Sequence, residues 1–195
     1  MNDGRKISTN IENPIDNILI DISYQLGKVF KIINITPNMI TTMSLLFTLI
    51  GIDYMYNSSY KIAGILYFIG YFFDCMDGNY ARTYKMTSQF GDYYDHIGDF
   101  LKFIFLLICI YLIKIKKKTK IIFVIIIFVL GLLMLQHLGC QEQIKDKKDK
   151  SILEIFNTLC SNKEFIKYTK YLGCGTVQLV ISLFIFNIEL IDKFI

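Results

Sequence analysis

The chain has 195 residues, of which 53% are hydrophobic and 19% are charged, and its formal net charge is +4. Its mean hydropathy is +0.43, and charged residues are scarcer than the roughly 25% typical of soluble domains. This composition excludes disordered and collagen-like chains, and a chain of this length cannot bury so much apolar surface in one soluble core. Several long apolar runs therefore predict an integral membrane protein.

The basic residues and cysteines exclude some other classes of function. Arginine occurs only at Arg5 and Arg82, and the lysines gather at the ends of apolar runs, as in the loops of membrane proteins. A nucleic-acid partner is not expected, because such proteins cluster Lys and Arg on one polar face. The five cysteines form no CxxC pair, and we expect buried free thiols.

Residues 15–33 follow a helical period, with an apolar stripe along one face and polar residues on the other. Asn13 is placed to cap this helix, and Pro14 suits its first turn. Such a helix is expected to lie along the membrane surface, although an ordinary helix packed on a bundle would show the same pattern. The stripe consists of Ile15, Ile18, Leu19, Ile22, Leu26, Val29, Phe30 and Ile33.

The rest of the chain predicts an all-α integral membrane protein with a bundle of five to six transmembrane helices. We expect residues 1–36 to form a tail and the interfacial helix, and residues 37–195 to form the membrane domain. The polar stretch at 141–170 predicts surface helices or an amphipathic sixth helix packed inside the bundle. The five clear spans are residues 37–56, 61–82, 90–113, 121–139 and 172–191.

Four aspartates lie at the ends of the second and third spans, which reach the roughly 20 residues of a span only if these ends are counted. Asp74 and Asp77 share one helix face, and Asp95 and Asp99 share another. The short connection makes the two helices antiparallel neighbours, so four carboxylates converge near one membrane surface. Such carboxylates repel one another unless a cation joins them. We expect two divalent ions there, which suit a diphosphate substrate.

Small and basic residues accompany the aspartates. Gly78 and Ala81 leave room for a ligand to approach the helix, Arg82 is suited to phosphate oxygens, and Gly91 opens the next helix. A hairpin with surface ion pairs explains this window poorly, because five aspartates face one arginine and one lysine in it.

The pattern D-x2-D-G-x2-A-R-x8-G-x3-D-x3-D is matched at every fixed position from Asp74 to Asp99. It resembles the signature of the CDP-alcohol phosphotransferases, also called class I CDP-alcohol phosphatidyltransferases. The stretch Pro37-Asn38-Met39-Ile40-Thr41 resembles the PNxxT with which many members open their first membrane helix. The resemblance implies transfer of a phosphoalcohol or phosphatidyl group from a CDP-linked donor to an acceptor hydroxyl, with release of CMP.

The resemblance also implies a role for each matching residue. Asp74, Asp77, Asp95 and Asp99 would bind two divalent ions, Mg²⁺ or Mn²⁺, and Asp99 would act as the general base. A site at the membrane surface would let a water-soluble substrate meet a lipid one. The substrate-binding residues would be Asn38, Thr41, Gly78, Ala81, Arg82, Ser88 and Gly91.

The resemblance leaves more than one donor and acceptor open. The pair Asp95-His96 resembles one in the aminoalcohol branch, which joins CDP-choline or CDP-ethanolamine to diacylglycerol, and we favour that branch. The alternative is a CDP-diacylglycerol-dependent enzyme that uses serine, inositol or another alcohol. A cation transporter and a non-catalytic membrane protein are remote alternatives, because the aspartates lie at helix ends on one hairpin and no repeat is visible.

We expect a multi-pass membrane protein whose active site faces the cytoplasm. A homodimer is compatible with this interpretation. The lysine-rich segment at 114–120 argues against that orientation, because lysines are usually retained on the cytoplasmic side. Family members usually have six membrane helices, and this chain shows five clear ones.

Overall fold

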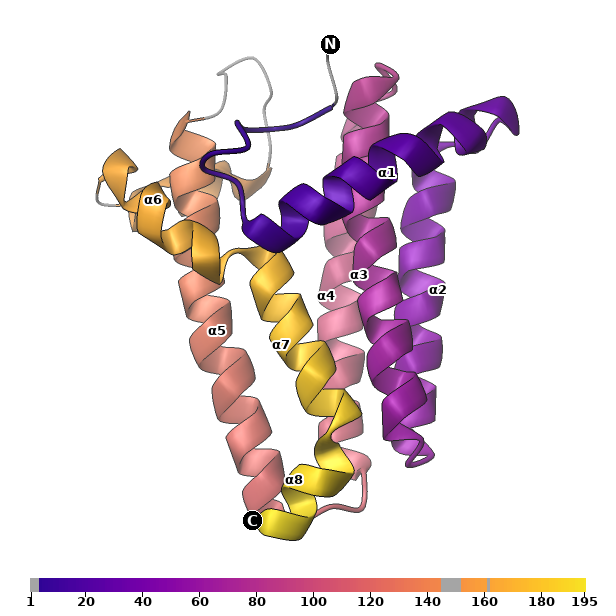
Figure 1. The fold of residues 1–195 in the computed structure, drawn as a ribbon, viewed down its shortest axis with the longest axis vertical. Coiled ribbons are helices and arrows are strands. Elements are labelled where there is room, and N and C mark those ends of the chain that lie inside the picture. The colour runs from indigo at the N-terminus through magenta and orange to yellow at the C-terminus, as the bar shows by residue number, and fades with distance from the viewer. Residues whose placement is uncertain (1–3, 145–151, 161) are drawn as a thin grey trace.

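The computed structural model describes residues 4–144, 152–160 and 162–195. These residues form helices and loops, which confirms the predicted all-α class. Most of the helices stand side by side, and α1 runs across one end of the group (Figure 1). The elements are α1 (Pro14–Ile32), α2 (Pro37–Tyr56), α3 (Tyr60–Thr83), α4 (Gln89–Leu112), α5 (Lys117–Ile144), η1 (Ile152–Leu159), η2 (Lys163–Phe165), α6 (Ile166–Thr169), η3 (Lys170–Leu172), α7 (Cys174–Phe186) and α8 (Ile188–Phe194), where η marks a 3-10 helix.

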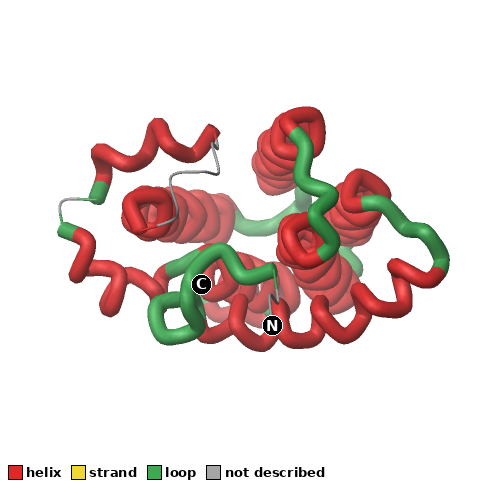
Figure 2. Tube along the Cα trace, turned by 90° about the horizontal axis from the view of Figure 1, so that it is seen from above, coloured by secondary structure: helices red, strands yellow, loops and turns green. Residues whose placement is uncertain are grey.

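Within the described residues, three helical runs are long and apolar enough to cross a membrane. They are α2, α5 and the run Ile166–Phe186, which contains α7. Helices α3 and α4 have 24 residues each, but the aspartates interrupt their apolar sequence. The first four expected spans coincide in position with helices α2 to α5, and of these α2 and α5 are long and apolar enough to cross a membrane. Seen from above, α1 lies along one edge of the upright helices (Figure 2).

Helix α3 is held between α2 and α7 by close backbone approaches. A Cβ atom on Gly70 of α3 would lie 2.9 Å from the backbone nitrogen of Thr48 on α2, so no side chain larger than hydrogen fits there. On the other side of α3, the Ser182 hydroxyl of α7 donates a hydrogen bond of 2.7 Å to the carbonyl of Gly64. Small residues permit this packing between apolar helices, and it fixes the position of the aspartates further along α3.

Helix α1 begins where the sequence predicts, because the Asn13 side chain accepts a hydrogen bond of 2.9 Å from the Ile15 amide. Much of its apolar stripe faces away from the bundle, with Ile18, Ile22 and Val29 at least half exposed. The face that packs on the bundle combines apolar residues with small and polar ones. It consists of Asp16, Leu19, Ile20, Ser23 and Gly27.

Asp16 anchors α1 to two other helices. Its carboxylate accepts hydrogen bonds from the Tyr71 hydroxyl of α3 at 2.5 Å and from the Gly175 amide of α7 at 3.2 Å. Burial raises the pKa of the Asp16 carboxyl above its ordinary value, and the hydrogen bond from Tyr71 acts in the opposite direction. The outward apolar stripe is thereby fixed in place, as an interfacial helix requires.

The last expected span, residues 172–191, is broken in the structure. Helix α7 ends at Phe186 and α8 begins at Ile188. The break has a tertiary cause: the Asp192 carboxylate accepts hydrogen bonds from the Thr119 hydroxyl at 2.5 Å and the Lys116 amide at 2.8 Å, at the start of α5. These bonds turn the end of the chain toward α5.

The stretch at 141–170 supplies no sixth spanning helix in its described part. It forms the end of α5 and three short 3-10 or α-helical segments before Lys170. Residues 145–151 and 161 lie outside the described residues. Here the expectation of free thiols is wrong for one pair, because Cys140 and Cys160 form a disulfide with Cα atoms 4.9 Å apart. The chain returns past the end of α5, which brings the two sulfurs together. Cys75, Cys109 and Cys174 are free, as expected.

Candidate active site

Helices α2, α3 and α4, whose arrangement is shown in Figure 1, bring polar side chains together. Asp74, Asp95 and Asp99 each present a carboxylate oxygen, and these three oxygens lie within 4.8 Å of one another. Within this group, Asp95 Oδ1 is buried without a hydrogen-bond partner. A buried oxygen of this kind is costly unless it binds something. Clustered carboxylates are the donors that Mg²⁺ and Mn²⁺ prefer, so these residues fit a divalent cation.

The remaining aspartate of the pattern, Asp77, has a different hydrogen-bond partner. Asp77 is 5% exposed, and its Oδ2 accepts a hydrogen bond of 2.5 Å from the Thr41 hydroxyl of α2. Asp77 lies one helical turn beyond Asp74, so it backs the cluster from the side of α2. The resemblance implies a substrate-binding role for Thr41, and the structure places its hydroxyl against Asp77.

Two residues of the cluster did not follow from the sequence. Lys102 of α4 contacts Asp74 Oδ1 at 2.5 Å and Asp99 Oδ1 at 2.7 Å with its Nζ atom. The Ser44 hydroxyl of α2 donates to Asp74 Oδ1 at 3.2 Å and accepts from Lys102 Nζ at 3.1 Å. A lysine inside a predicted span, three residues after Asp99, was the signal that could have identified Lys102.

The residues that open α4 form a second small group. Ser88 caps the helix by accepting a hydrogen bond of 3.0 Å from the Gly91 amide. A Cβ atom on Gly91 would lie 3.2 Å from Asn38 Oδ1 and 3.1 Å from the Ser88 hydroxyl oxygen. Asn38, Ser88 and Gly91 are thus brought together, and glycine leaves the space between them open.

Arg82 is directed toward the N-terminal segment. Its Nε donates a hydrogen bond of 2.7 Å to the carbonyl oxygen of Gly4, and its guanidinium lies over Gly78, 3.1 Å from where a Cβ atom would be. Ala81 is half-buried beside it on the same helix. Gly78, Ala81 and Arg82 therefore lie together, and Gly78 gives the guanidinium room to fold back on α3.

His96 lies beside the cluster without joining it. Its Nδ1 atom is 2.8 Å from the backbone oxygen of Asp92, one turn earlier on α4. The same nitrogen is 3.8 Å from Asp95 Oδ2, too far for a hydrogen bond. The imidazole is thus oriented by the backbone of its own helix.

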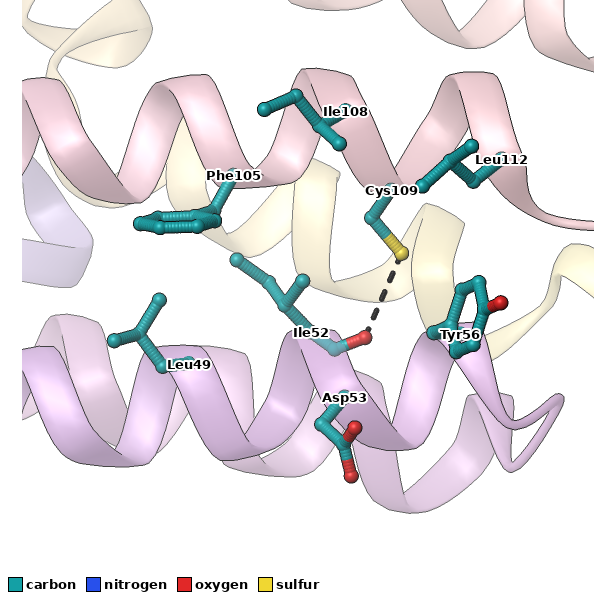
Figure 3. Close-up of a pocket in the computed structure, with 8 residues that line it drawn as sticks. All are labelled: Leu49, Ile52, Asp53, Tyr56, Phe105, Ile108, Cys109 and Leu112. Carbon is teal, nitrogen blue, oxygen red and sulfur yellow. Dashed lines mark hydrogen bonds between the residues drawn. The ribbon is translucent and has the colours of Figure 1, made fainter.

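A separate cavity of about 250 Å³ lies further along the seam between α2 and α4. Its lining is mainly apolar, and Figure 3 shows side chains from both helices facing it, with the Cys109 thiol donating to the carbonyl of Ile52 at 3.5 Å. Asp53 contributes its carboxylate, and no aspartate of the cluster lines the cavity. This cavity is therefore separate from the carboxylate cluster.

Comparison with known proteins agrees with this geometry. The family model of the CDP-alcohol phosphatidyltransferases matches residues 34–188, which include every residue of the cluster. The chain belongs to this family. A CDP-alcohol phosphatidyltransferase was expected from the spacing of Asp74, Asp77, Asp95 and Asp99, so the predicted family is confirmed.

One curated relative is an archaetidylinositol phosphate synthase from Pyrococcus horikoshii. It is 32% identical over 94 residues, which cover 48% of this chain and 46% of the relative. The chain thus spans about half the length of the curated relative it matches.

Proposed function

We propose that this phosphatidyltransferase moves an alcohol phosphate or phosphatidyl group from a CDP-linked donor to an acceptor hydroxyl and releases CMP. The observation that carries the proposal is the carboxylate cluster of Asp74, Asp95 and Asp99, with one buried oxygen that has no partner. The family match over residues 34–188 supports the reaction class. A transporter or a scaffold would not require these carboxylates beside a family signature for nucleotide chemistry.

In this proposal Asp74, Asp95 and Asp99 hold Mg²⁺ or Mn²⁺, and Asp77 contributes from the adjacent turn. Bound divalent ions would neutralise the donor diphosphate and stabilise CMP as the leaving group. Thr41 and Ser44 orient the carboxylates, because each hydroxyl donates to one aspartate. Asn38, Ser88, Gly78, Ala81, Arg82 and Gly91 are proposed to contact the nucleotide end of the donor.

Asp99 is proposed as the general base. Its side chain is 51% exposed, compared with 19% for Asp74 and 29% for Asp95, so it is the carboxylate of these three that an acceptor can reach most easily. Asp99 would take the proton of the acceptor hydroxyl as that oxygen attacks the phosphorus bearing the transferred alcohol. The bond from this phosphorus to the oxygen of CMP then breaks, and CMP departs with the electron pair.

Two substrate pairs have support from different observations. The favoured pair is a CDP-linked lipid donor with an inositol-type polyol or its phosphate, supported by the named relative. The second pair is CDP-choline or CDP-ethanolamine with diacylglycerol, supported by the sequence pair Asp95-His96. His96 bonds to its own helix in this structure, which weakens the second case.

The test is a substrate panel with the purified protein in mixed micelles. CDP-diacylglycerol is paired with inositol, inositol phosphate and serine, and CDP-choline and CDP-ethanolamine are paired with diacylglycerol. Lipid products are identified by mass spectrometry for the wild type, Asp95→Asn and the matched control Asp53→Asn, which lies in the distant cavity. We expect one pair to give product with the wild type and the control, and none with Asp95→Asn. Equal product from all three proteins would refute the proposal.

The position of α1 also supports different roles for the N-terminal segment and the rest of the chain. We propose that residues 1–36 form a tail and interfacial helix that help to admit the lipid substrate, and that residues 37–195 form the catalytic membrane domain. The family match begins at residue 34, close to this boundary. Because Asp16 of α1 accepts a hydrogen bond from Tyr71, one turn before Asp74 on α3, a cytoplasmic site would place α1 on the cytoplasmic leaflet, where Lys28 and Lys31 suit anionic headgroups.

A further inference from the structure

Lys102 lies in an unusual place for a lysine, inside the carboxylate cluster. Its side chain is only 13% exposed. The ammonium group has three N–H donors, and it contacts three acceptors: Asp74 at 2.5 Å, Asp99 at 2.7 Å and Ser44 at 3.1 Å. These contacts join all three helices of the site, because Asp74 lies on α3, Asp99 on α4 and Ser44 on α2.

Two of the three acceptors of Lys102 are also proposed ligands of the divalent cation. Asp74 and Asp99 belong to the group of three carboxylates that fit such an ion. An ion bound there would repel the ammonium and would compete for the same oxygens. Because the Lys102 side chain is only 13% exposed, a lysine there that lost two of its three acceptors would need another anion. The diphosphate of a CDP-linked donor is an anion of the right kind in the right place.

We infer that Lys102 is the counter-ion of the carboxylates before substrate binds. When the divalent cation binds, the ammonium group of Lys102 leaves the carboxylates and pairs with the diphosphate of the donor. The inference rests on the proposed function, because it assumes that Asp74 and Asp99 bind that cation. Lys102 is therefore a positioning residue for the metal and a binding residue for the nucleotide. Lys102 lies outside the family pattern, which ends at Asp99, and the cation within the pattern, Arg82, donates instead to the carbonyl of Gly4.

This role makes the divalent cation and the nucleoside diphosphate bind cooperatively. The cation alone must displace Lys102 from two carboxylates, whereas the cation with a diphosphate leaves the ammonium paired. Each ligand therefore raises the affinity of the other by the same factor, as linkage requires. Removal of the positive charge should strengthen binding of the cation alone and weaken this coupling.

The experiment measures Mn²⁺ binding by electron paramagnetic resonance in detergent micelles, with and without CDP as the diphosphate probe. It compares the wild type with Lys102→Met and with the control Lys118→Met, which removes an exposed lysine near the start of α5, at the other end of the bundle. We expect CDP to tighten Mn²⁺ binding to the wild type and the control by about 5- to 150-fold, the usual range for coupled sites. In Lys102→Met, Mn²⁺ alone should bind tighter than in the wild type, and CDP should tighten Mn²⁺ binding by a smaller factor than in the wild type, because only the direct attraction between the ion and the diphosphate remains.

The outcomes separate the inference from the proposed function. If the wild type binds neither Mn²⁺ nor CDP, the proposed function fails. If the wild type binds both and Lys102→Met shows the same Mn²⁺ affinity and the same coupling, the inference fails and the function stands. Lys102→Gln carries the same test if the methionine variant does not fold, because glutamine is also neutral but keeps a hydrogen-bond donor. Lys102→Arg, which retains the charge, should preserve the coupling.

Discussion

Glu12 provides the most quantitative test of how α1 is attached to the bundle. This glutamate precedes α1 and is 6% exposed. Its carboxylate accepts hydrogen bonds from the Asn13 amide at 3.0 Å and the Gln141 side chain of α5 at 3.3 Å. Burial, reinforced by the nearby charge of Asp16, raises the pKa of Glu12 from its ordinary 4.5 to about 7.

A raised carboxyl pKa stabilises the folded protein at low pH. Between pH 4.5 and about 7 the unfolded chain has released the Glu12 proton and the folded protein still holds it. This contribution is complete below pH 4.5 and is lost as the pH rises through about 7. At about 1.4 kcal/mol per pH unit, the loss amounts to about 3 kcal/mol. Glu12→Gln keeps the size of the side chain and has no proton to lose.

The measurement is the free energy of unfolding in detergent micelles, by chemical denaturation followed by circular dichroism, from pH 4.5 to 8. The difference between Glu12→Gln and the wild type should rise by about 3 kcal/mol in favour of the variant across this range. Glu164→Gln, at an exposed glutamate, is the matched control and should follow the wild type. Parallel curves for Glu12→Gln and the wild type would refute the argument that Glu12 is buried in its protonated form.

Three further predictions concern the site and its orientation. Asp99→Asn should lower kcat by about 10²- to 10⁴-fold with little change in CDP affinity, and lost CDP binding with unchanged kcat would contradict its role as base. Thr41→Val removes the hydroxyl that donates to Asp77 and should lower the free energy of unfolding by about 1.5–3 kcal/mol, whereas an unchanged denaturation curve would exclude a structural role for that bond. In sealed vesicles, single cysteines at positions 25 and 86 should react with an impermeant thiol reagent from one side and a cysteine at 117 from the other. Labelling of all three from one side would show that the helices cross the membrane differently.

The convergence of the aspartates was predictable from the sequence because their arrangement is local. Asp95 and Asp99 are one turn apart on α4, and helical geometry alone places them on one face. Their approach to Asp74 followed from a short connection between antiparallel helices. The start of α1 was equally predictable, because Asn13 caps its own helix.

Features that depend on contacts between distant segments could not be predicted in this way. Ser44 and Lys102 are separated by 58 positions and meet only because α2 packs beside α4. The break at Asn187 depends on Asp192 reaching the start of α5, and nothing in the apolar run 172–191 signals it. The disulfide between Cys140 and Cys160 likewise requires the chain to fold back on α5.

Release of CMP by the purified protein tests the central claim most directly, namely that the carboxylate cluster performs CDP-alcohol transfer. The assay counts CMP and lipid product formed from a CDP-linked donor, with Mg²⁺ or with excess chelator, for the wild type and Asp74→Asn. We expect equal amounts of CMP and product with the wild type and Mg²⁺, and neither with chelator or with Asp74→Asn. CMP formation that persists in the variant or in excess chelator would contradict it.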